Sequence, residues 1–230
     1  EKSQREELRQ QFTANVSHEL KTPLTSISGF AEILKAGGTD EATTKDFATS
    51  IYDESQRMIT LVNDIIKLSK LDEKSISLEK EAISLREMCR EVMSVLSVSA
   101  KSKNITVNLT GDSGLINGVQ PVIYEMVYNL IDNAIKYNVQ DGKVDINLQN
   151  LMESHRVILT VKDTGIGIPA NEKERIFERF YRIDKSRSKQ NGGTGLGLSI
   201  VKHAAKYHEA SILVNSEVGK GSTFTVIFPV

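Results

Sequence analysis

The segment between Phe12 and Leu24 constrains the fold more than any other stretch of the chain. His18 lies nearly opposite an apolar stripe about 120° wide on a helical wheel, with Thr22 close to it, so its imidazole points to solvent or to a docking partner. Pro23 interrupts the same helix and costs about 3 kcal/mol there. The segment is either an amphipathic helix with an incidental surface histidine or a functional site. The stripe consists of Phe12, Val16, Leu20, Leu24, Ile27, Ala31 and Leu34.

A second amphipathic helix is predicted to end near residue 71 and to form a hairpin with the first. The glycines at 37 and 38 end the first helix, and Thr43 or Thr44 is expected to cap the second. One hairpin cannot cover two apolar stripes from water, whereas two copies can do so in a four-helix bundle. We therefore expect a homodimer through residues 1–71, the alternative being a hairpin folded back on a second domain. The second stripe consists of Phe47, Ile51, Met58, Leu61, Val62, Ile65 and Leu68.

The composition is that of a globular protein with two modest cores, since 39% of the 230 residues are hydrophobic and 26% are charged. A formal net charge of −1 gives no indication of nucleic-acid binding. The single cysteine, Cys89, excludes an internal disulfide and a cysteine metal cluster, and we expect it in a helix core. No apolar run approaches membrane-spanning length. Because the first residue is not Met, we expect that further sequence precedes it.

A change of composition near residues 72–75 predicts a linker between a helical hairpin, residues 1–74, and a mixed α/β domain, residues 75–230. Alternating apolar and polar residues in the second part predict half-buried strands in this mixed α/β domain. The expected strands cover residues 75–80, 105–109, 144–148, 156–161, 211–215 and 222–228. The expected helices cover residues 85–100, 120–137 and 195–207, with one or two helical turns around 174–180.

Three polar residues share one face of the helix predicted at 120–137, namely Asn129, Asn133 and Lys136. Asparagine is a poor helix former, so two of them in mid-helix call for a compensating role. An amide oxygen suits Mg²⁺, and a lysine ammonium suits phosphate. The alternative is the solvent-facing side of an amphipathic helix.

Two glycine-rich segments complete a candidate nucleotide site. Asp163 ends a predicted strand and can accept a hydrogen bond from the amino group of adenine, while Gly165 and Gly167 allow close approach of a flat base. An acidic turn that merely ends the strand is the alternative. Residues 192–199 open a helix, whose N-terminal N–H groups favour phosphate. No strand leads directly into that segment, so the dinucleotide-binding motif is not indicated.

Five segments along residues 5–228 resemble, in order, the H, N, G1, F and G2 boxes of the sensor histidine kinases of two-component systems. They are residues 12–25, 129–137, 163–169, 177–184 and 192–199. The five boxes in this order are far more specific than any one of them. The resemblance implies a dimerising phosphoacceptor hairpin followed by a Bergerat-type ATP-binding α/β sandwich with a mobile lid. It also implies a cytoplasmic fragment of a parent protein anchored in the bacterial membrane.

The resemblance assigns roles to individual residues. His18 would be the phosphoacceptor, Glu19 would orient its ring and take its proton, and Thr22 would help to place the water that dephosphorylates a response regulator. Arg179 or Arg182 would reach phosphate or the other domain, with packing alone as the alternative. ATP and Mg²⁺ would be bound by Asn129, Asn133, Lys136, Tyr137, Asp163, Gly165, Gly167, Arg179, Gly193, Thr194, Gly195, Leu196, Gly197 and Thr223, with Asn133 as the metal ligand.

The expected function is ATP-dependent autophosphorylation of His18, followed by transfer to an aspartate of a response-regulator receiver domain and by phosphatase activity toward that regulator. Two other classes remain open. One is an ATP-sensing dimeric scaffold without phosphotransfer. The other is a mechanical ATPase of the gyrase type, which would release free phosphate even after His18→Ala. The hairpin with the H box favours the kinase.

Overall fold

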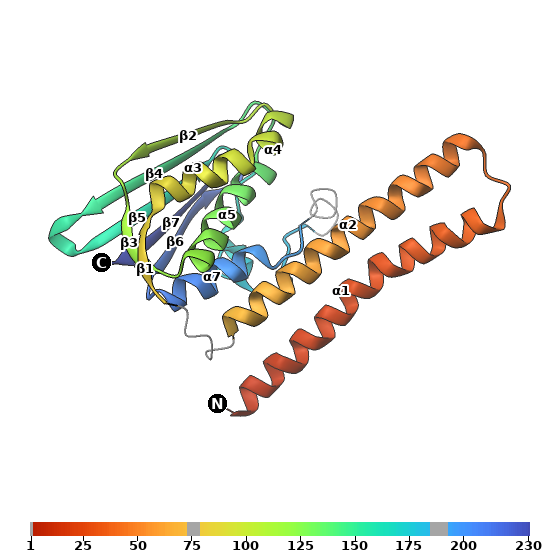
Figure 1. Cartoon of the computed structure of the whole chain (residues 1–230), viewed down its shortest axis with the longest axis horizontal. Coiled ribbons are helices and arrows are strands. Elements are labelled where there is room, and N and C mark those ends of the chain that lie inside the picture. The colour runs from red at the N-terminus through yellow and green to blue at the C-terminus, as the bar shows by residue number, and fades with distance from the viewer. Residues whose placement is uncertain (1, 73–78, 185–192) are drawn as a thin grey trace. The chain divides into compact units, whose positions relative to one another are not determined.

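The computed structural model describes residues 2–72, 79–184 and 193–230. The chain divides into two compact units, the first built on the helical hairpin through Lys67 together with residues 193–194, and the second on the other described residues from Leu68 onward. Figure 1 shows the two long helices of the first unit and the sheet with its helices in the second. Within the described ranges, no helix combines the length and the hydropathy needed to cross a bilayer. The predicted hairpin and α/β domain are both confirmed.

The hairpin consists of α1 (Lys2–Ala36) and α2 (Glu41–Asp72), as the apolar stripes predict. Gly37 and Gly38 lie between them at φ values of 77° and 89°, a left-handed conformation that ends the first helix. The predicted cap at Thr43 or Thr44 is wrong. The Asp40 carboxylate accepts the Thr43 N–H at 2.7 Å instead, and the hydrogen bonds from Thr43 lower the pKa of Asp40. A carboxylate directly before the first turn is a better acceptor for these N–H groups than a hydroxyl inside the turn.

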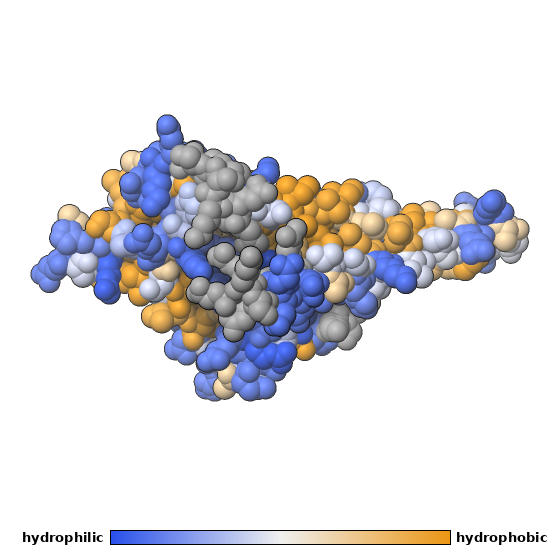
Figure 2. Space-filling view, turned by 90° about the horizontal axis from the view of Figure 1, so that it is seen from below, coloured by the Kyte–Doolittle hydropathy of each residue, from blue (hydrophilic) through white to orange (hydrophobic). Residues whose placement is uncertain are grey.

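The two helices of the hairpin cover each other's apolar stripes only in part. Phe30 of α1 and Phe47 of α2 face each other with ring centroids 5.1 Å apart. Leu24 and Val62, in contrast, are 55% and 40% exposed, although both belong to the predicted stripes. Figure 2 shows hydrophobic residues gathered in a band along the hairpin. Among the hairpin side chains that the structure describes, the exposed large apolar ones are Leu24, Ile33, Tyr52, Ile59, Val62 and Ile66.

The second unit is a mixed five-stranded sheet with helices on one face (Figure 1). The strand order is β2-β4-β5-β7-β6, in which β2 and β4 are parallel and the other neighbours are antiparallel. The strands are β2 (Thr106–Gly111), β4 (Lys143–Leu151), β5 (Arg156–Asp163), β6 (Ser211–Glu217) and β7 (Gly221–Pro229). The helices are α3 (Leu85–Val95), α4 (Ser97–Ser102), α5 (Gln120–Lys136) and α7 (Gly197–Tyr207), with single 3₁₀ turns η1 (Met152–Ser154), η2 (Ala170–Glu172) and η3 (Arg175–Phe177).

The core of this unit lies between the sheet and its helices. Alternate residues of the central strands are buried, as period-2 patterning requires when one sheet face is covered. Helix α5 contributes the largest helical share and has Pro121 in its first turn, where the missing N–H costs nothing. The central buried residues are Ile123, Val127, Leu130 and Ile131 of α5, Val144, Ile146 and Leu148 of β4, Val157, Leu159 and Val161 of β5, and Val226 and Phe228 of β7.

Two short strands differ from the sequence-based expectation. The strand expected at residues 75–80 falls mostly outside the described residues. The structure has a strand directly after that range, β1 (Glu81–Ser84). It pairs antiparallel with β3 (Leu115–Gly118), which was not predicted. The helix expected over residues 85–100 is divided between α3 and α4, with Leu96 at ψ 2° between them. Four-residue strands carry too little periodicity to be recognised without their partner.

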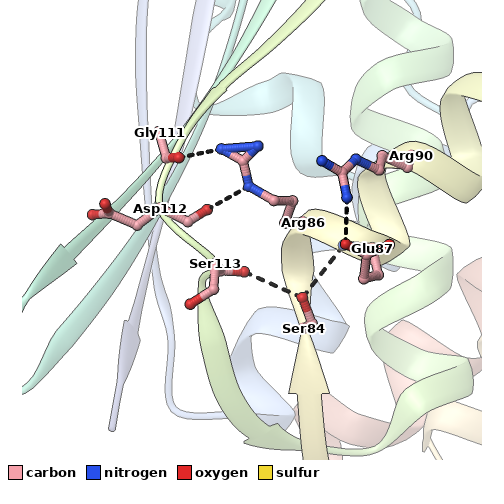
Figure 3. A network of polar contacts seen from close by, with 7 residues as sticks. All are labelled: Ser84, Arg86, Glu87, Arg90, Gly111, Asp112 and Ser113. Atoms are coloured by element: carbon pink, nitrogen blue, oxygen red, sulfur yellow. Dashed lines mark hydrogen bonds and ion pairs between the residues drawn. The ribbon is translucent and has the colours of Figure 1, made fainter.

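A polar network fixes the start of α3 against the turn that follows β2 (Figure 3). The Arg86 Nε donates to the Asp112 carbonyl oxygen at 3.0 Å, and its Nη2 donates to the Gly111 carbonyl oxygen. The Ser84 hydroxyl caps α3 by accepting the Glu87 N–H at 3.4 Å. A Cβ atom at Gly111 would lie 1.9 Å from the Leu148 carbonyl oxygen, so this turn needs glycine. The network is structural and positions α3 over the sheet.

Candidate functional site

His18 is displayed on the surface of α1, as the helical wheel predicts. Its side chain is 77% exposed, and its Nδ1 lies 3.7 Å from Oε1 of Glu19. Thr22, one turn later, donates its hydroxyl to the His18 carbonyl oxygen at 3.2 Å. Pro23 is buried inside the same helix. The segment therefore presents a nucleophile, a carboxylate and a hydroxyl within little more than one helical turn.

Asp163 is buried where β5 ends. Its Oδ1 accepts the N–H of Gly165 at 2.8 Å and the N–H of Ser222 at 3.2 Å. Burial raises the pKa of Asp163, although the two N–H bonds act in the opposite direction. Its Oδ2 has no hydrogen-bond partner among the described residues. A buried carboxylate with one oxygen fixed and the other available suits recognition of an amino group.

The glycines after Asp163 are required by close backbone approach. A Cβ atom at Gly165 would lie 2.3 Å from the Tyr137 carbonyl oxygen, and one at Gly167 would lie 2.1 Å from the Glu217 carbonyl oxygen. The Ile166 N–H donates to the Tyr137 carbonyl oxygen at 3.1 Å. Residues 164–168 are thus held between the end of α5 and the end of β6. Tyr137 contributes its backbone to this arrangement.

Asn138 is a site residue that the sequence reasoning missed. It is 8% exposed, and its Oδ1 accepts the Thr164 hydroxyl at 3.0 Å and the Val139 N–H at 2.9 Å. Its Nδ2 donates to the Lys143 carbonyl oxygen at 3.0 Å. Asn138 therefore ties the loop after α5 to the turn that follows Asp163. A polar residue directly after a predicted helix was the only local signal, because the Thr164 partner is distant in sequence.

Asn129, Asn133 and Lys136 all lie on α5, each partly exposed. The Asn129 Nδ2 donates to the Glu125 carbonyl oxygen at 2.8 Å, and its Oδ1 lies 2.6 Å from the position of a Cβ atom at Gly197. The first residue of α7 therefore has to be glycine, which brings the start of that helix next to Asn129.

Lys136 is less available than its sequence position suggests. Its Nζ lies 2.7 Å from Oδ2 of Asp132, one turn earlier on α5. Burial lowers the pKa of Lys136, but the charge and hydrogen bond of Asp132 outweigh it and leave the pKa raised. The ammonium group is therefore permanently charged but already partly neutralised.

The segment before α7 is joined to the segment after η3. The Phe180 N–H donates to the Gly195 carbonyl oxygen at 2.8 Å, and a Cβ atom at Gly195 would lie 2.8 Å from the Phe180 carbonyl carbon. Leu196 is fully buried, and α7 begins at Gly197 rather than at the predicted Gly195. Gly193 and Thr194 precede this junction. Residues 185–192, which include Gly192 and part of the predicted lid, lie outside the described residues.

The structure gathers half of the predicted nucleotide residues at two places in the second unit. Asp163, its glycines and the backbone of Tyr137 meet beside the start of β7, where Thr223 follows Ser222 and lies opposite Lys162 in register. Asn129 meets Gly197 at the start of α7. Arg179 contacts His203 of α7 at 3.1 Å. His18, Glu19 and Thr22 belong to the first unit.

Two family models match the chain. Residues 118–230 match the model described as histidine kinase-, DNA gyrase B-, and HSP90-like ATPase. Residues 8–74 match the His Kinase A (phospho-acceptor) domain. The second unit is therefore an ATP-binding domain of the class shared by these ATPases, and the hairpin that precedes it is of the phosphoacceptor kind.

Known proteins match the chain over most or all of its length. The sensor protein kinase WalK of Staphylococcus aureus is 36% identical over 230 residues, which is 100% of this chain and 55% of WalK. The solved complex of histidine kinase ThkA with response regulator protein TrrA is 27% identical, with a TM-score of 0.79, and the match covers 100% of this chain and 64% of the ThkA chain. Full-length ShkA in complex with AMPPNP is 27% identical, with a TM-score of 0.68, over 94% of this chain and 45% of ShkA. The chain belongs to the sensor histidine kinases of two-component systems, and it spans about half the length of the curated relatives it matches.

Proposed function

We propose that this chain is the catalytic portion of a sensor histidine kinase that phosphorylates its own His18 from ATP. In this proposal residues 1–74 form the dimerising phosphoacceptor hairpin, and residues 75–230 bind the nucleotide. The observation that carries it is an imidazole 77% exposed beside Glu19, in a chain that also has the buried Asp163 site. The names of WalK, a sensor protein kinase, and of ShkA, solved with the ATP analogue AMPPNP, support the same assignment.

In this proposal the two ring nitrogens of His18 have different roles. Nδ1 faces Glu19 at 3.7 Å, so a small side-chain rotation brings Nδ1–H into hydrogen-bonding distance of the carboxylate. Nε2 then holds the lone pair that attacks the γ-phosphorus of ATP. The new N–P bond forms as the bond from the γ-phosphorus to the β,γ-bridging oxygen breaks, and ADP leaves. Glu19 stabilises the imidazolium and accepts its proton.

The nucleotide is held by the residues at the two places described above. The free Oδ2 of Asp163 accepts from the adenine amino group, and Gly165 and Gly167 leave room for the flat base. Backbone N–H groups at the start of α7, which begins at Gly197, would face the phosphates. Lys136 adds positive charge, reduced by its bond to Asp132.

The donor set on α5 fits Mg²⁺. An amide oxygen is a hard ligand, and Mg²⁺ is an ion that keeps several waters and shares phosphate oxygens. We assign the Asn133 amide oxygen as the protein ligand, with Asn129 assisting. The bound ion would neutralise charge on the β- and γ-phosphates.

The exposed apolar side chains of the hairpin support the homodimer. A second copy would bury residues such as Leu24 and Ile59, which are 55% and 53% exposed in the single chain. Sedimentation equilibrium should show a dimer for the unaltered chain and a monomer for Ile59→Lys. The matched control is Val98→Lys, at a residue 77% exposed in the second unit, which should remain dimeric. A monomeric unaltered chain, or a dimeric Ile59→Lys variant, would contradict this part of the proposal.

The partner would be a response-regulator receiver domain that docks near His18 and takes the phosphoryl group on an aspartate, as the complex of ThkA with TrrA suggests. Thr22 would serve the reverse, dephosphorylating activity by placing a water molecule. Its hydroxyl lies one turn from His18 and donates to the His18 backbone. Thr22→Ala should therefore keep autophosphorylation but lose most of the phosphatase activity toward the regulator.

The kinase assignment is tested by incubating the purified chain with ATP labelled on the γ-phosphate. Label should stay on the protein, survive base and be lost in acid, and it should be absent from His18→Ala and Asn133→Ala. The control is His155→Ala, at an exposed histidine in the turn between β4 and β5. Free phosphate that persists in His18→Ala without phosphoprotein would indicate the gyrase-type ATPase. ATP binding without any transfer would indicate a scaffold.

A further inference from the structure

His203 lies within α7 and contacts the guanidinium group of Arg179, which belongs to the segment after η3. The Arg179 Nη2 and the His203 Nε2 are 3.1 Å apart. The His203 Nδ1 lies 2.8 Å from the Ser199 carbonyl oxygen, one turn earlier on the same helix. His203 is partly buried, so the contact is sheltered from water on part of its surface.

One neutral tautomer of His203 satisfies both of these contacts. A carbonyl oxygen can only accept, so Nδ1 carries the hydrogen that Ser199 receives. A neutral imidazole has a single N–H, and its Nε2 therefore has a lone pair directed at Arg179. The guanidinium group can only donate, so the neutral tautomer satisfies both neighbours at once.

The segment that bears Arg179 is fastened on both sides of this contact. Phe180 has a φ of 65°, which is uncommon for a residue other than glycine, and its N–H is bound to Gly195 at 2.8 Å. Before Arg179, the Phe177 ring meets the Phe224 ring edge-on with centroids 6.5 Å apart. The backbone is therefore held in place on both sides of Arg179, whose guanidinium group contacts His203 of α7.

We propose that His203 is a positioning residue that holds Arg179 on α7, so that a permanent positive charge is already in place when ATP binds at the start of that helix. The inference rests on the proposed function, because it concerns the same nucleotide site. A guanidinium group ordered before binding loses less side-chain entropy on meeting phosphate than a free one. Loss of the contact should therefore weaken ATP binding more than it slows phosphoryl transfer.

The experiment compares two amides at position 203 in the whole chain. His203→Gln puts an amide oxygen near the place of Nε2 and can still accept from Arg179. His203→Asn is one methylene shorter and cannot reach it. We expect His203→Asn to raise the KM for ATP about tenfold, as for loss of a charged hydrogen bond, with kcat within about twofold. His203→Gln should restore KM to within about threefold of the unaltered chain.

Three outcomes would overturn the proposal. The first is that His203→Gln and His203→Asn raise the KM for ATP equally. The second is that His203→Asn lowers kcat and leaves KM unchanged. The third is that His203→Asn raises KM as much in an Arg179→Ala background as in the unaltered chain. In that background the proposal expects His203→Asn to add nothing. Lys202→Ala, at an exposed neighbour on α7, is the control and should resemble the unaltered chain. Calorimetry measures the ATP affinity of the same variants without any phosphoryl transfer. The role of His203 is therefore tested even if His18 is not labelled, a result that would refute only the kinase assignment.

Discussion

Replacement of Asp163 by asparagine should separate nucleotide recognition from stability. An asparagine in the same rotamer keeps an oxygen at the place of Oδ1, where it accepts from Gly165 at 2.8 Å and Ser222 at 3.2 Å. Its amide nitrogen then replaces Oδ2 and presents a donor to the adenine amino group, which is also a donor. Losing a charged hydrogen bond costs about 1.5–3 kcal/mol. The Kd for ATP should therefore rise about 10- to 150-fold.

Asp163→Asn should not lower the free energy of unfolding, although it weakens ATP binding. Because burial raises the pKa of Asp163, its ionised form is disfavoured in the folded state relative to the unfolded state. Free energy of unfolding is then lost as the pH rises through that raised pKa, and a neutral asparagine avoids this loss. At pH 7, Asp163→Asn should have a Tm equal to or above that of the unaltered chain.

Isothermal titration with ATP and thermal denaturation without it measure the two quantities. The matched control is Asp145→Asn on the neighbouring strand β4, whose carboxylate accepts from Asn108 at 2.9 Å. It should bind ATP like the unaltered chain. The affinity of the unaltered chain should also fall as acidification protonates Asp163, whereas that of Asp163→Asn should not follow this titration. Unchanged ATP affinity in Asp163→Asn at pH 7, or loss of its fold, would refute the reasoning.

Three further predictions concern stability and reactivity. Gly221→Ala should lower the free energy of unfolding by about 3 kcal/mol in urea, because its Cβ would lie 2.0 Å from the Asp163 carbonyl oxygen at a φ of 97°. Burial lowers the pKa of His208, whose Nε2 accepts the Val119 N–H at 3.0 Å, so its stabilising effect is complete above a pH of about 6.5 and is lost as the pH falls below that value; urea denaturation at pH 8 and pH 5.5 should differ less in His208→Gln. Burial raises the pKa of Cys89 to about 12, so iodoacetamide at pH 8 should modify it only after unfolding, and rapid labelling of the folded chain would contradict its buried position.

Periodicity was sufficient to predict the long elements. The stripes of α1 and α2 and the alternation in β4, β5 and β7 each extend over enough residues to distinguish period 3.6 from period 2. β1 and β3 have four residues each and pair only with each other, so their periodicity could not show them. The exposure of Leu24, which the stripe predicts to be buried, is a property of a single hairpin that offers too little surface to cover both stripes.

The candidate site was predictable in its residue types and not in its connections. The sequence indicated Asp163 and its glycines, because a carboxylate and residues without a side chain suit a buried base. It could not indicate that Asn138 holds the adjacent turn, since its bond to Thr164 joins residues from two loops. It could not indicate either that Asp132 forms an ion pair with Lys136, because an i,i+4 pair is a common surface feature of helices.

The most direct test of the account is to identify the atom that receives phosphate. The chain would be incubated with ATP and Mg²⁺, denatured in base and examined by ³¹P nuclear magnetic resonance and by peptide mass spectrometry. The orientation of Glu19 toward Nδ1 at 3.7 Å predicts a single phosphohistidine, on Nε2 of His18. Phosphate on Nδ1, on another residue, or only free in solution would contradict the account.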